Sequence, residues 1–304
     1  MIGKDYETHK IKNQIKKYFE IKDVGDVDFI IGIKFQKYHN GYILHQKRYT
    51  LNILDKFKKY NIFPSMNLKP SENEININTN KKFNPTIYRS AIGNLLYLAI
   101  STRPDILFAV SKAARRSQNP TVDDWNKVIK IFNYLKGNTN YGLYFTKDKT
   151  IKAYSDADYA GNKDSRRSTS GFMITIGNSP ISWSSKLQHC VSTSTAESEY
   201  YSLSECSKHC IWIKNMLNEL HQNNKEINIY VDNRATIHMS KNVLINQKSK
   251  HIDIRYHHVR ELIADKKIKL NHINSKYNLA DGLTKYLNNK SLNDFKNRIL
   301  IEFK

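Results

Sequence analysis

The sequence predicts an α/β protein, in which a mixed sheet flanked by helices is preceded by a smaller α+β region made of a hairpin plus a helical bundle. Three observations lead to this prediction. Residues 29–54 alternate apolar and polar side chains around a turn. Three helical segments follow, and from Lys152 onward short strands and helices occur in the order β-β-β-α-β-α-α-β-α. A length of 304 residues suggests about two domains with a substantial hydrophobic core.

Each element of the first part has a local signal. Asn40 and Gly41 both tolerate positive φ, so they predict the hairpin turn. The Asn-rich stretch 71–84 predicts an exposed connector. The strings "STRPD" and "QNPTVDD" each supply a proline and a capping residue between helices. We expect helices over residues 87–99, 104–117 and 121–136.

In the second part, three strands are expected first, in "IKAYSDA", "SGFMITIG" and "SPISWSS". A long helix over about 195–220 follows them, then the strand "INIYVD" and a short helix through Ser240. The segment "HIDIRYHHVRELIADK" is expected to be helical and "KIKLNHI" to be a strand. A final helical region is expected to begin in "LADGLTKYL".

The charge of the chain favours a polyanionic partner. Its formal net charge is +21, and both parts contribute, with 26 basic against 13 acidic residues up to residue 150 and 23 against 15 beyond it. Phosphate neutralisation by such a surface releases counterions and drives binding to nucleic acid. A basic soluble protein without such a partner is the alternative.

Several classes of protein are disfavoured by what the sequence lacks. Cys190, Cys206 and Cys210 form no Cys-x-x-Cys pair, so buried reduced thiols are favoured over a zinc site. No phosphate-binding glycine loop occurs. No signal peptide and no apolar run of ~18 residues is present, so we expect an intracellular, cytoplasmic protein with possible access to the nucleus and no membrane partner.

Three acidic residues lie at strand ends or helix starts, where α/β proteins place functional side chains. Asp156 ends the first strand and is preferred to Asp158, although both could cap a turn. Asp232 ends "INIYV", and Asp281 stands at the start of a helix, where an ordinary N-cap is the alternative.

Helical spacing selects the fourth acid. Glu199 opens an apolar stripe of the long helix, whereas Glu197 lies on the solvated side and suits the helix dipole. A carboxylate on an apolar stripe is costly unless it meets a cation or a proton. The stripe consists of Glu199, Leu203, Cys206, Cys210, Ile213, Leu217 and Leu220.

The string "IYVDNRA" also admits a polymerase site, because polymerases bind metal on a hairpin that ends in adjacent aspartates. Here Asn233 follows Asp232, and "NRATIHMS" predicts a helix rather than a second strand. The four acids instead fit a site for two hard divalent cations ~4 Å apart, which can activate water and stabilise a leaving oxygen in phosphodiester hydrolysis.

Long strings of this sequence resemble one known family. "AYSDADYAGNKDSRRSTSGFMITIGNSPISWSSKLQHCVSTSTAESEYYSLSE", "IYVDNRATIHMS", "KHIDIRYHHVRE" and "LADGLTKYL" are similar to the ribonuclease H domain of copia-type LTR-retrotransposon Pol polyproteins. "YRSAIGNLLYLAISTRPDILFAV" and "IFNYLKGNTNYGL" resemble the end of the reverse transcriptase of the same polyproteins. The resemblance implies a reverse-transcriptase end with thumb- or connection-like helices over 1–147, a ribonuclease H domain over 148–290 and a C-terminal helix or tail over 291–304.

The resemblance implies cleavage of the RNA strand of an RNA–DNA hybrid with two Mg²⁺ ions, for which Mn²⁺ can substitute. The family's catalytic and metal-binding positions fall on Asp156, Glu199, Asp232 and Asp281. The polymerase aspartates of the family lie upstream of a segment like "IGKDYETHKIKNQ", so no polymerase activity is expected here. Other Pol segments are possible partners.

Hybrid contacts are assigned to residues near the predicted site, although a solvated loop is the alternative for each of them. A hybrid differs from duplex DNA in its 2′-hydroxyls and minor-groove shape. The phosphate contacts assigned on this basis are Lys163, Arg166 and Arg167, with Ser192, Thr193 and Ser194 as hydroxyl donors.

Two rival functions remain open. The chain could be a catalytically inactive nucleic-acid-binding remnant of a decayed retrotransposon, which would bind hybrid without cutting it. A strand-transfer or junction nuclease would instead cut DNA alone, which the retrotransposon strings disfavour.

Overall fold

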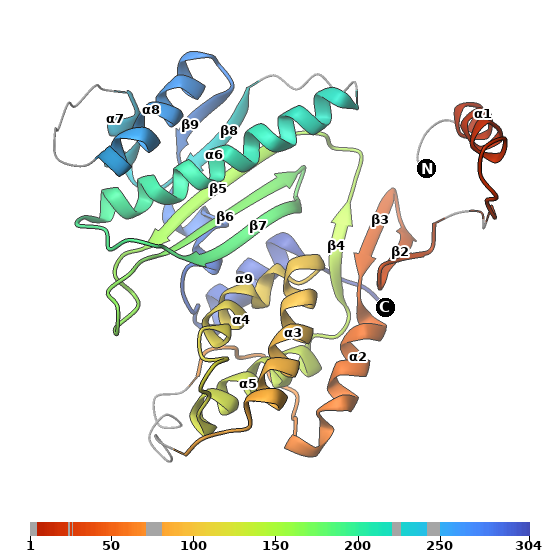
Figure 1. The fold of residues 1–304 in the computed structure, drawn as a ribbon, viewed down its shortest axis with the longest axis horizontal. Coiled ribbons are helices and arrows are strands. Elements are labelled where there is room, and N and C mark those ends of the chain that lie inside the picture. The colour runs from red at the N-terminus through yellow and green to blue at the C-terminus, as the bar shows by residue number, and fades with distance from the viewer. Residues whose placement is uncertain (1–4, 24, 26, 71–80, 221–225, 242–249) are drawn as a thin grey trace.

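The computed structural model describes residues 5–23, 25, 27–70, 81–220, 226–241 and 250–304. These residues form two five-stranded sheets with helices packed around them, so the mixed α/β architecture predicted from the sequence is confirmed (Figure 1). The predicted connector 71–84 falls mostly outside the described residues.

The first sheet is antiparallel and has the strand order β1-β2-β3-β4-β10. It joins the predicted hairpin to two short strands that the sequence analysis did not anticipate, β4 and β10. The strands are β1 (Phe29–Ile30), β2 (Ile33–Tyr38), β3 (Gly41–His45), β4 (Tyr141–Phe145) and β10 (Ile301–Glu302).

The predicted hairpin is present, but its turn lies one residue earlier than expected. Tyr38 pairs with Gly41, so His39 and Asn40 form the loop, and His39 takes the positive φ of 46°. Gly41 is needed for another reason: a Cβ there would overlap the carbonyl oxygen of Phe145 on the neighbouring strand. The glycine therefore permits close strand packing rather than a left-handed turn.

The helices of the first half begin where the sequence supplies caps. Asn84 accepts hydrogen bonds from the backbone amides of Thr86 and Ile87, with Pro85 at the first helical position. Thr121 and Asp124 form a capping box. These helices are α1 (Asp5–Lys16), α2 (Lys47–Lys56), α3 (Pro85–Ser101), α4 (Leu107–Ala114) and α5 (Val122–Gly137), with 3₁₀ turns at η1 (Lys58–Tyr60) and η3 (Pro104–Ile106).

The second sheet has the strand order β7-β6-β5-β8-β9. Strands β5, β8 and β9 are parallel to one another. Strand β6 pairs antiparallel with β5, and β7 in turn pairs antiparallel with β6 at the edge of the sheet. The carboxyl ends of the three parallel strands therefore meet at one edge. The strands are β5 (Ile151–Asp158), β6 (Thr169–Ile176), β7 (Ser179–Leu187), β8 (Ile227–Val231) and β9 (Ile268–His272).

The helices of the second half follow the predicted order, and the long helix lies across one face of the second sheet (Figure 1). The expected helical region in "LADGLTKYL" is only a 3₁₀ turn, and the helix begins later, at Asn289. The elements are α6 (Thr195–Glu219), α7 (Arg234–Lys241), α8 (Lys250–Ala264), η4 (Ser275–Tyr277), η5 (Asp281–Leu283) and α9 (Asn289–Ile299).

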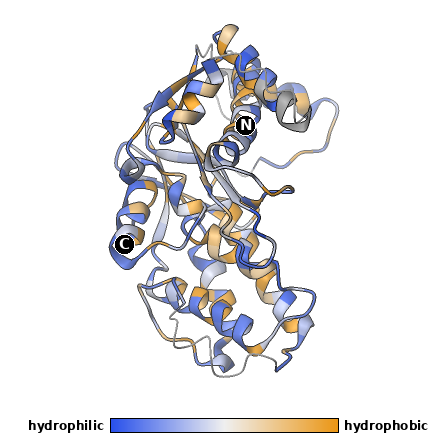
Figure 2. Cartoon of the chain, turned by 90° about the vertical axis from the view of Figure 1, so that its left-hand side faces the viewer, coloured by the Kyte–Doolittle hydropathy of each residue, from blue (hydrophilic) through white to orange (hydrophobic). Residues whose placement is uncertain are grey.

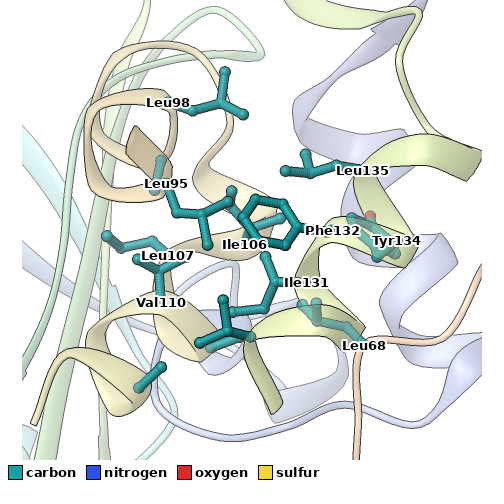
Figure 3. Packing of buried hydrophobic residues seen from close by; sticks show 14 of the residues in the cluster. Leu68, Leu95, Leu98, Ile106, Leu107, Val110, Ile131, Phe132, Tyr134 and Leu135 are labelled. Atoms are coloured by element: carbon teal, nitrogen blue, oxygen red, sulfur yellow. The ribbon is translucent and has the colours of Figure 1, made fainter. Parts of the chain in front are cut away.

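Two hydrophobic cores hold the molecule together. One lies between the second sheet and helices α6 and α8. The other is built by α3, α4 and α5, whose buried side chains interdigitate in Figure 3, and it reaches the opposite face of the second sheet through Met173. Trp183 on β7 also donates its indole N–H to the carbonyl of Ala99 on α3, at 2.9 Å. The two halves therefore share a core instead of meeting at a polar linker.

The C-terminal segment returns to the first half. Leu292, Phe295 and Ile299 of α9 are buried in the first core, and Ile301 pairs with Gly142 of β4. The helix expected in 291–304 is thus followed by a strand. The second sheet is consequently inserted between β4 and the last strand of the first sheet.

The described helices alternate hydrophilic and hydrophobic residues along their length, as the blue and orange segments of Figure 2 show. Among them, none combines the length and the apolar character that a membrane crossing requires.

Candidate active site

Two aspartates meet at the carboxyl edge of the second sheet because of strand register. On parallel strands β5 and β8, Ser155 stands beside Val231, so the next residues, Asp156 and Asp232, occupy neighbouring positions. Asp156 is only 5% exposed. The strand continues through Asp158, so Asp156 lies two residues before its end, and the turn expected directly after Asp156 begins later.

Glu199 reaches this edge from the first turns of α6. Ser194 caps the helix by accepting from the amide of Glu197, and the apolar stripe predicted for the helix is buried at Leu203 and Cys206. Glu199 is 4% exposed. Glu197 instead accepts hydrogen bonds from the amide and hydroxyl of Thr193, which places it at the helix start as expected. At the far end of the stripe, Leu220 is exposed.

The structure brings three of the four predicted acids together. One carboxylate oxygen from each of Asp156, Glu199 and Asp232 lies within 4.8 Å of the other two. Asp281 stands beside this triad in η5, close enough for its charge to act on Asp156 and Glu199. Its Oδ1 is 2.5 Å from Nζ of Lys285.

The electrostatics of the triad oppose full ionisation. Burial raises the pKa of Asp156 to about 7, and the charges of Asp281 and Asp232 act in the same direction, against a hydrogen bond from Thr284. Burial likewise raises the pKa of Glu199 to about 10, with the charges of Asp156 and Asp232 adding to it. Like charges in a desolvated cluster cannot all ionise without a cation.

The donor set fits a hard divalent cation. Oε2 of Glu199 is buried and has no hydrogen-bond partner among the described residues. Such an orphaned oxygen costs free energy unless a ligand satisfies it. Three carboxylates with an unsatisfied oxygen form the oxygen-rich site that Mg²⁺ or Mn²⁺ prefers.

Thr284 and Gly171 support Asp156, and sequence reasoning missed both. The Thr284 hydroxyl donates to Oδ2 of Asp156 at 2.5 Å. Gly171 lies on β6 and pairs with Asp156 of β5. A Cβ at Gly171 would lie 2.7 Å from Cγ2 of Thr284. Gly171 therefore leaves the space that Thr284 needs, and the only local signal was the position of Thr284 three residues after Asp281.

Lys285 is a third residue that the sequence analysis missed. Burial alone would lower its pKa, but the hydrogen bond and charge of Asp281, with the charges of Asp156 and Asp232, raise it instead. Lys285 therefore carries a positive charge at the edge of the acidic cluster. Its spacing of four residues from Asp281 was the available signal.

The predicted nucleic-acid contacts fall into two groups. Lys163, Arg166 and Arg167 are exposed in the loop between β5 and β6. The three hydroxyl residues before α6 are engaged within the protein. Ser192 is buried and donates to Gln188, Thr193 donates to Glu197 and Ser194 caps α6. Ser192 is thus poorly placed to reach a phosphate.

The chain is 38% identical to the retrovirus-related Pol polyprotein from transposon TNT 1-94 of Nicotiana tabacum, over 94% of this chain and 22% of that protein. It is 34% identical to the Pol polyprotein from transposon RE1 of Arabidopsis thaliana, over 96% of this chain and 20% of that protein. The chain belongs to the family of retrovirus-related Pol polyproteins. The resemblance inferred from its sequence is confirmed, and this Pol-family chain spans about a fifth of the length of these relatives.

Among solved structures, the Pol-family chain is similar to a ribonuclease H1 isolated from compost, with 17% identity, a TM-score of 0.34 and coverage of 48% of this chain and 97% of that one. It is also similar to a foamy viral protease–reverse transcriptase in complex with double-stranded DNA, with 9% identity, a TM-score of 0.45 and coverage of 81% and 37%. No protein-family model matches the chain.

Proposed function

We propose that this Pol-family chain is a ribonuclease H that hydrolyses the RNA strand of RNA–DNA hybrids with two divalent metal ions. The observation that carries the proposal is the triad of the buried Asp156 and Glu199 with the half-buried Asp232, in which one carboxylate oxygen from each residue lies within 4.8 Å of the other two. Membership in the Pol family supports the choice of substrate. Magnesium is the proposed cofactor, with manganese as a substitute.

The residues of the triad would hold the cations, and Asp281 is proposed to complete the set from η5. When bound, the divalent ions supply activation of a water molecule and neutralisation of charge at the scissile phosphate. Thr284 keeps Asp156 oriented through its hydroxyl. Ala157 donates its backbone amide to Glu199 and fixes that carboxylate at the end of β5.

Substrate contact is proposed for the exposed cations of the loop between β5 and β6, which are Lys163, Arg166 and Arg167. Phosphate contacts of this kind position the duplex without reading its sequence. Thr193 and Ser194, before α6, are also proposed to contact the substrate. Ser192 is not, because its side chain is buried. Other Pol segments are proposed partners of the chain.

The decisive experiment is cleavage of a labelled RNA–DNA hybrid in the presence and absence of Mg²⁺. We expect Mg²⁺-dependent cutting of the RNA strand only, and we expect Asp232→Asn to abolish it because one cation ligand is lost. Asp265→Asn is a matched control, since Asp265 is exposed and paired with Lys267 away from the triad.

The outcomes separate the rival functions. A folded wild-type chain that binds hybrid without cutting it would be an inactive remnant. Cleavage of duplex DNA alone would indicate a junction nuclease. Equal cleavage by wild type and Asp232→Asn would show that the triad is not the catalytic site.

A further inference from the structure

Helix α4, from the first half of the chain, is fastened to the loop that follows the active-site strand. Arg116, just after α4, forms an ion pair with Asp164 of that loop at 2.8 Å. Arg115 donates from Nη2 to the hydroxyl of Thr169 at 3.4 Å. Thr169 pairs with Asp158 on β5, two residues beyond Asp156, so the end of α4 lies beside the nuclease edge (Figure 1).

Lys112 is positioned one turn earlier on the same helix. Its Nζ lies 4.9 Å from the ring centre of Tyr286 and 5.7 Å from that of Phe108. Tyr286 directly follows Lys285 of the acidic cluster. The aromatic rings hold the lysine near Asp158, close enough for the two charges to act on each other, and the Lys112 side chain remains exposed to solvent.

The surface at the end of α4, around Lys112 and Arg115, carries an excess of positive charge. Although the Lys112 side chain is exposed, partial desolvation by the surrounding side chains lowers its pKa, as do the charges of Arg115, Lys127 and Lys163, while the charge of Asp158 opposes them. Within the part of the chain that the structure describes, no carboxylate lies within ion-pair distance of Lys112 or Arg115. Gathering cations at a partly desolvated site is unfavourable unless a polyanion binds there.

We propose that Lys112 and Arg115 bind the phosphate backbone of the nucleic acid held at the triad, so that the hybrid-binding surface is built jointly by α4 and the loop between β5 and β6. This inference rests on the proposed function. It follows that the first half of the chain takes part directly in substrate binding, through helix α4, which contacts the second sheet and the loop between β5 and β6.

The test measures binding of a fluorescent RNA–DNA hybrid by anisotropy, in buffer without divalent cations and over about 50 to 200 mM salt. We expect the double variant Lys112→Ala/Arg115→Ala to bind about ten-fold more weakly than wild type, and the salt slope to fall by up to about 1.8, since each phosphate contact contributes about 0.9.

The matched control is Lys37→Ala/Arg48→Ala, which removes the same charges from β2 and α2, on the other side of Figure 1 from α4. We expect this pair to change the affinity less than two-fold. A second variant, Lys112→Arg/Arg115→Lys, keeps both charges and should bind like wild type, which separates charge from folding effects. Lys112→Met/Arg115→Met preserves the apolar stems and should bind as weakly as the alanine pair.

Each result bears on the inference. Equal weakening by the α4 pair and the control pair would overturn it, as would an unchanged affinity in the alanine and methionine variants. A wild-type chain that binds hybrid but does not cut it with Mg²⁺ would contradict the proposed function while the α4 comparison still stands. Failure of wild type to bind hybrid would contradict both.

Discussion

Nζ of Lys296 donates to Oδ1 of Asn138 at 2.7 Å, and the lysine is almost completely buried. The bond joins the C-terminal helix α9 to the end of α5. The carbonyl of Asn138 also accepts from Arg103, which is buried in an ion pair with Asp105 at 2.7 Å. The C-terminal helix is therefore tied into the polar centre of the first half.

From this arrangement we expect Lys296→Met to destabilise the protein by about 2 kcal/mol, because Oδ1 of Asn138 would stay buried without a donor. The measurement is the free energy of unfolding in urea. Lys290→Met on the exposed side of the same helix is the control and should change stability by less than about 0.5 kcal/mol. Similar losses of unfolding free energy in Lys296→Met and Lys290→Met would contradict a stabilising role of the bond between Lys296 and Asn138.

Glu199→Gln should abolish cleavage while making the metal-free protein more stable at pH 8, by about 1–3 kcal/mol. The folded pKa of Glu199, about 10, lies above its unfolded value near ~4.3. Stability is therefore highest below the unfolded pKa and is lost as pH rises toward the folded pKa. Thermal unfolding at pH 4.5 and pH 8 checks this.

Most of the stabilisation by Glu199→Gln should disappear at the lower pH, because pH 4.5 lies close to the unfolded pKa of ~4.3 and the wild-type carboxyl is protonated in the folded state at little cost. Glu197→Gln is the matched control, since Glu197 is half-buried in the first turn of the same helix and accepts hydrogen bonds from Thr193 outside the triad. A destabilising effect of Glu199→Gln at pH 8 would show that ionised Glu199 does not destabilise the metal-free acidic cluster.

Thr284→Val removes the hydroxyl that donates to Asp156 and keeps the side-chain shape. Because that hydrogen bond lowers the pKa of Asp156, its loss should raise the pKa further above about 7. We expect the rising limb of the pH–rate profile to move to higher pH and the rate at neutral pH to fall about ten-fold. Thr284→Ser should restore the profile, and an unshifted Thr284→Val profile would exclude this role.

Lys285→Met should strengthen metal binding. Nζ of Lys285 occupies Oδ1 of Asp281 at 2.5 Å, so it repels an incoming cation and competes for this oxygen. If the repulsion between Lys285 and the bound cation costs about 1 kcal/mol, its removal should lower the Mn²⁺ concentration for half-maximal thermal stabilisation about five-fold. Lys276→Met, in the exposed turn η4, should leave it unchanged. A weaker Mn²⁺ response in Lys285→Met would show that the lysine supports the metal site.

The sequence by itself determined the order of elements in the second half and the choice of Glu199 over Glu197. Both depend on periodicity within one segment, because a helix places every third or fourth residue on one face and a strand alternates its side chains. The positions of Asp156 near the end of β5 and of Asp232 directly after β8 were equally local features. Parallel pairing then made them neighbours.

Only the tertiary structure decided what surrounds those residues. Thr284 meets Asp156 across 128 residues and Lys296 meets Asn138 across 158, and no periodicity links positions so far apart. Strand β10 is short and its pairing with β4 depends on where α9 packs. The placement of α4 beside the edge of the second sheet that carries the triad has the same origin, because the core that the two halves share fixes it.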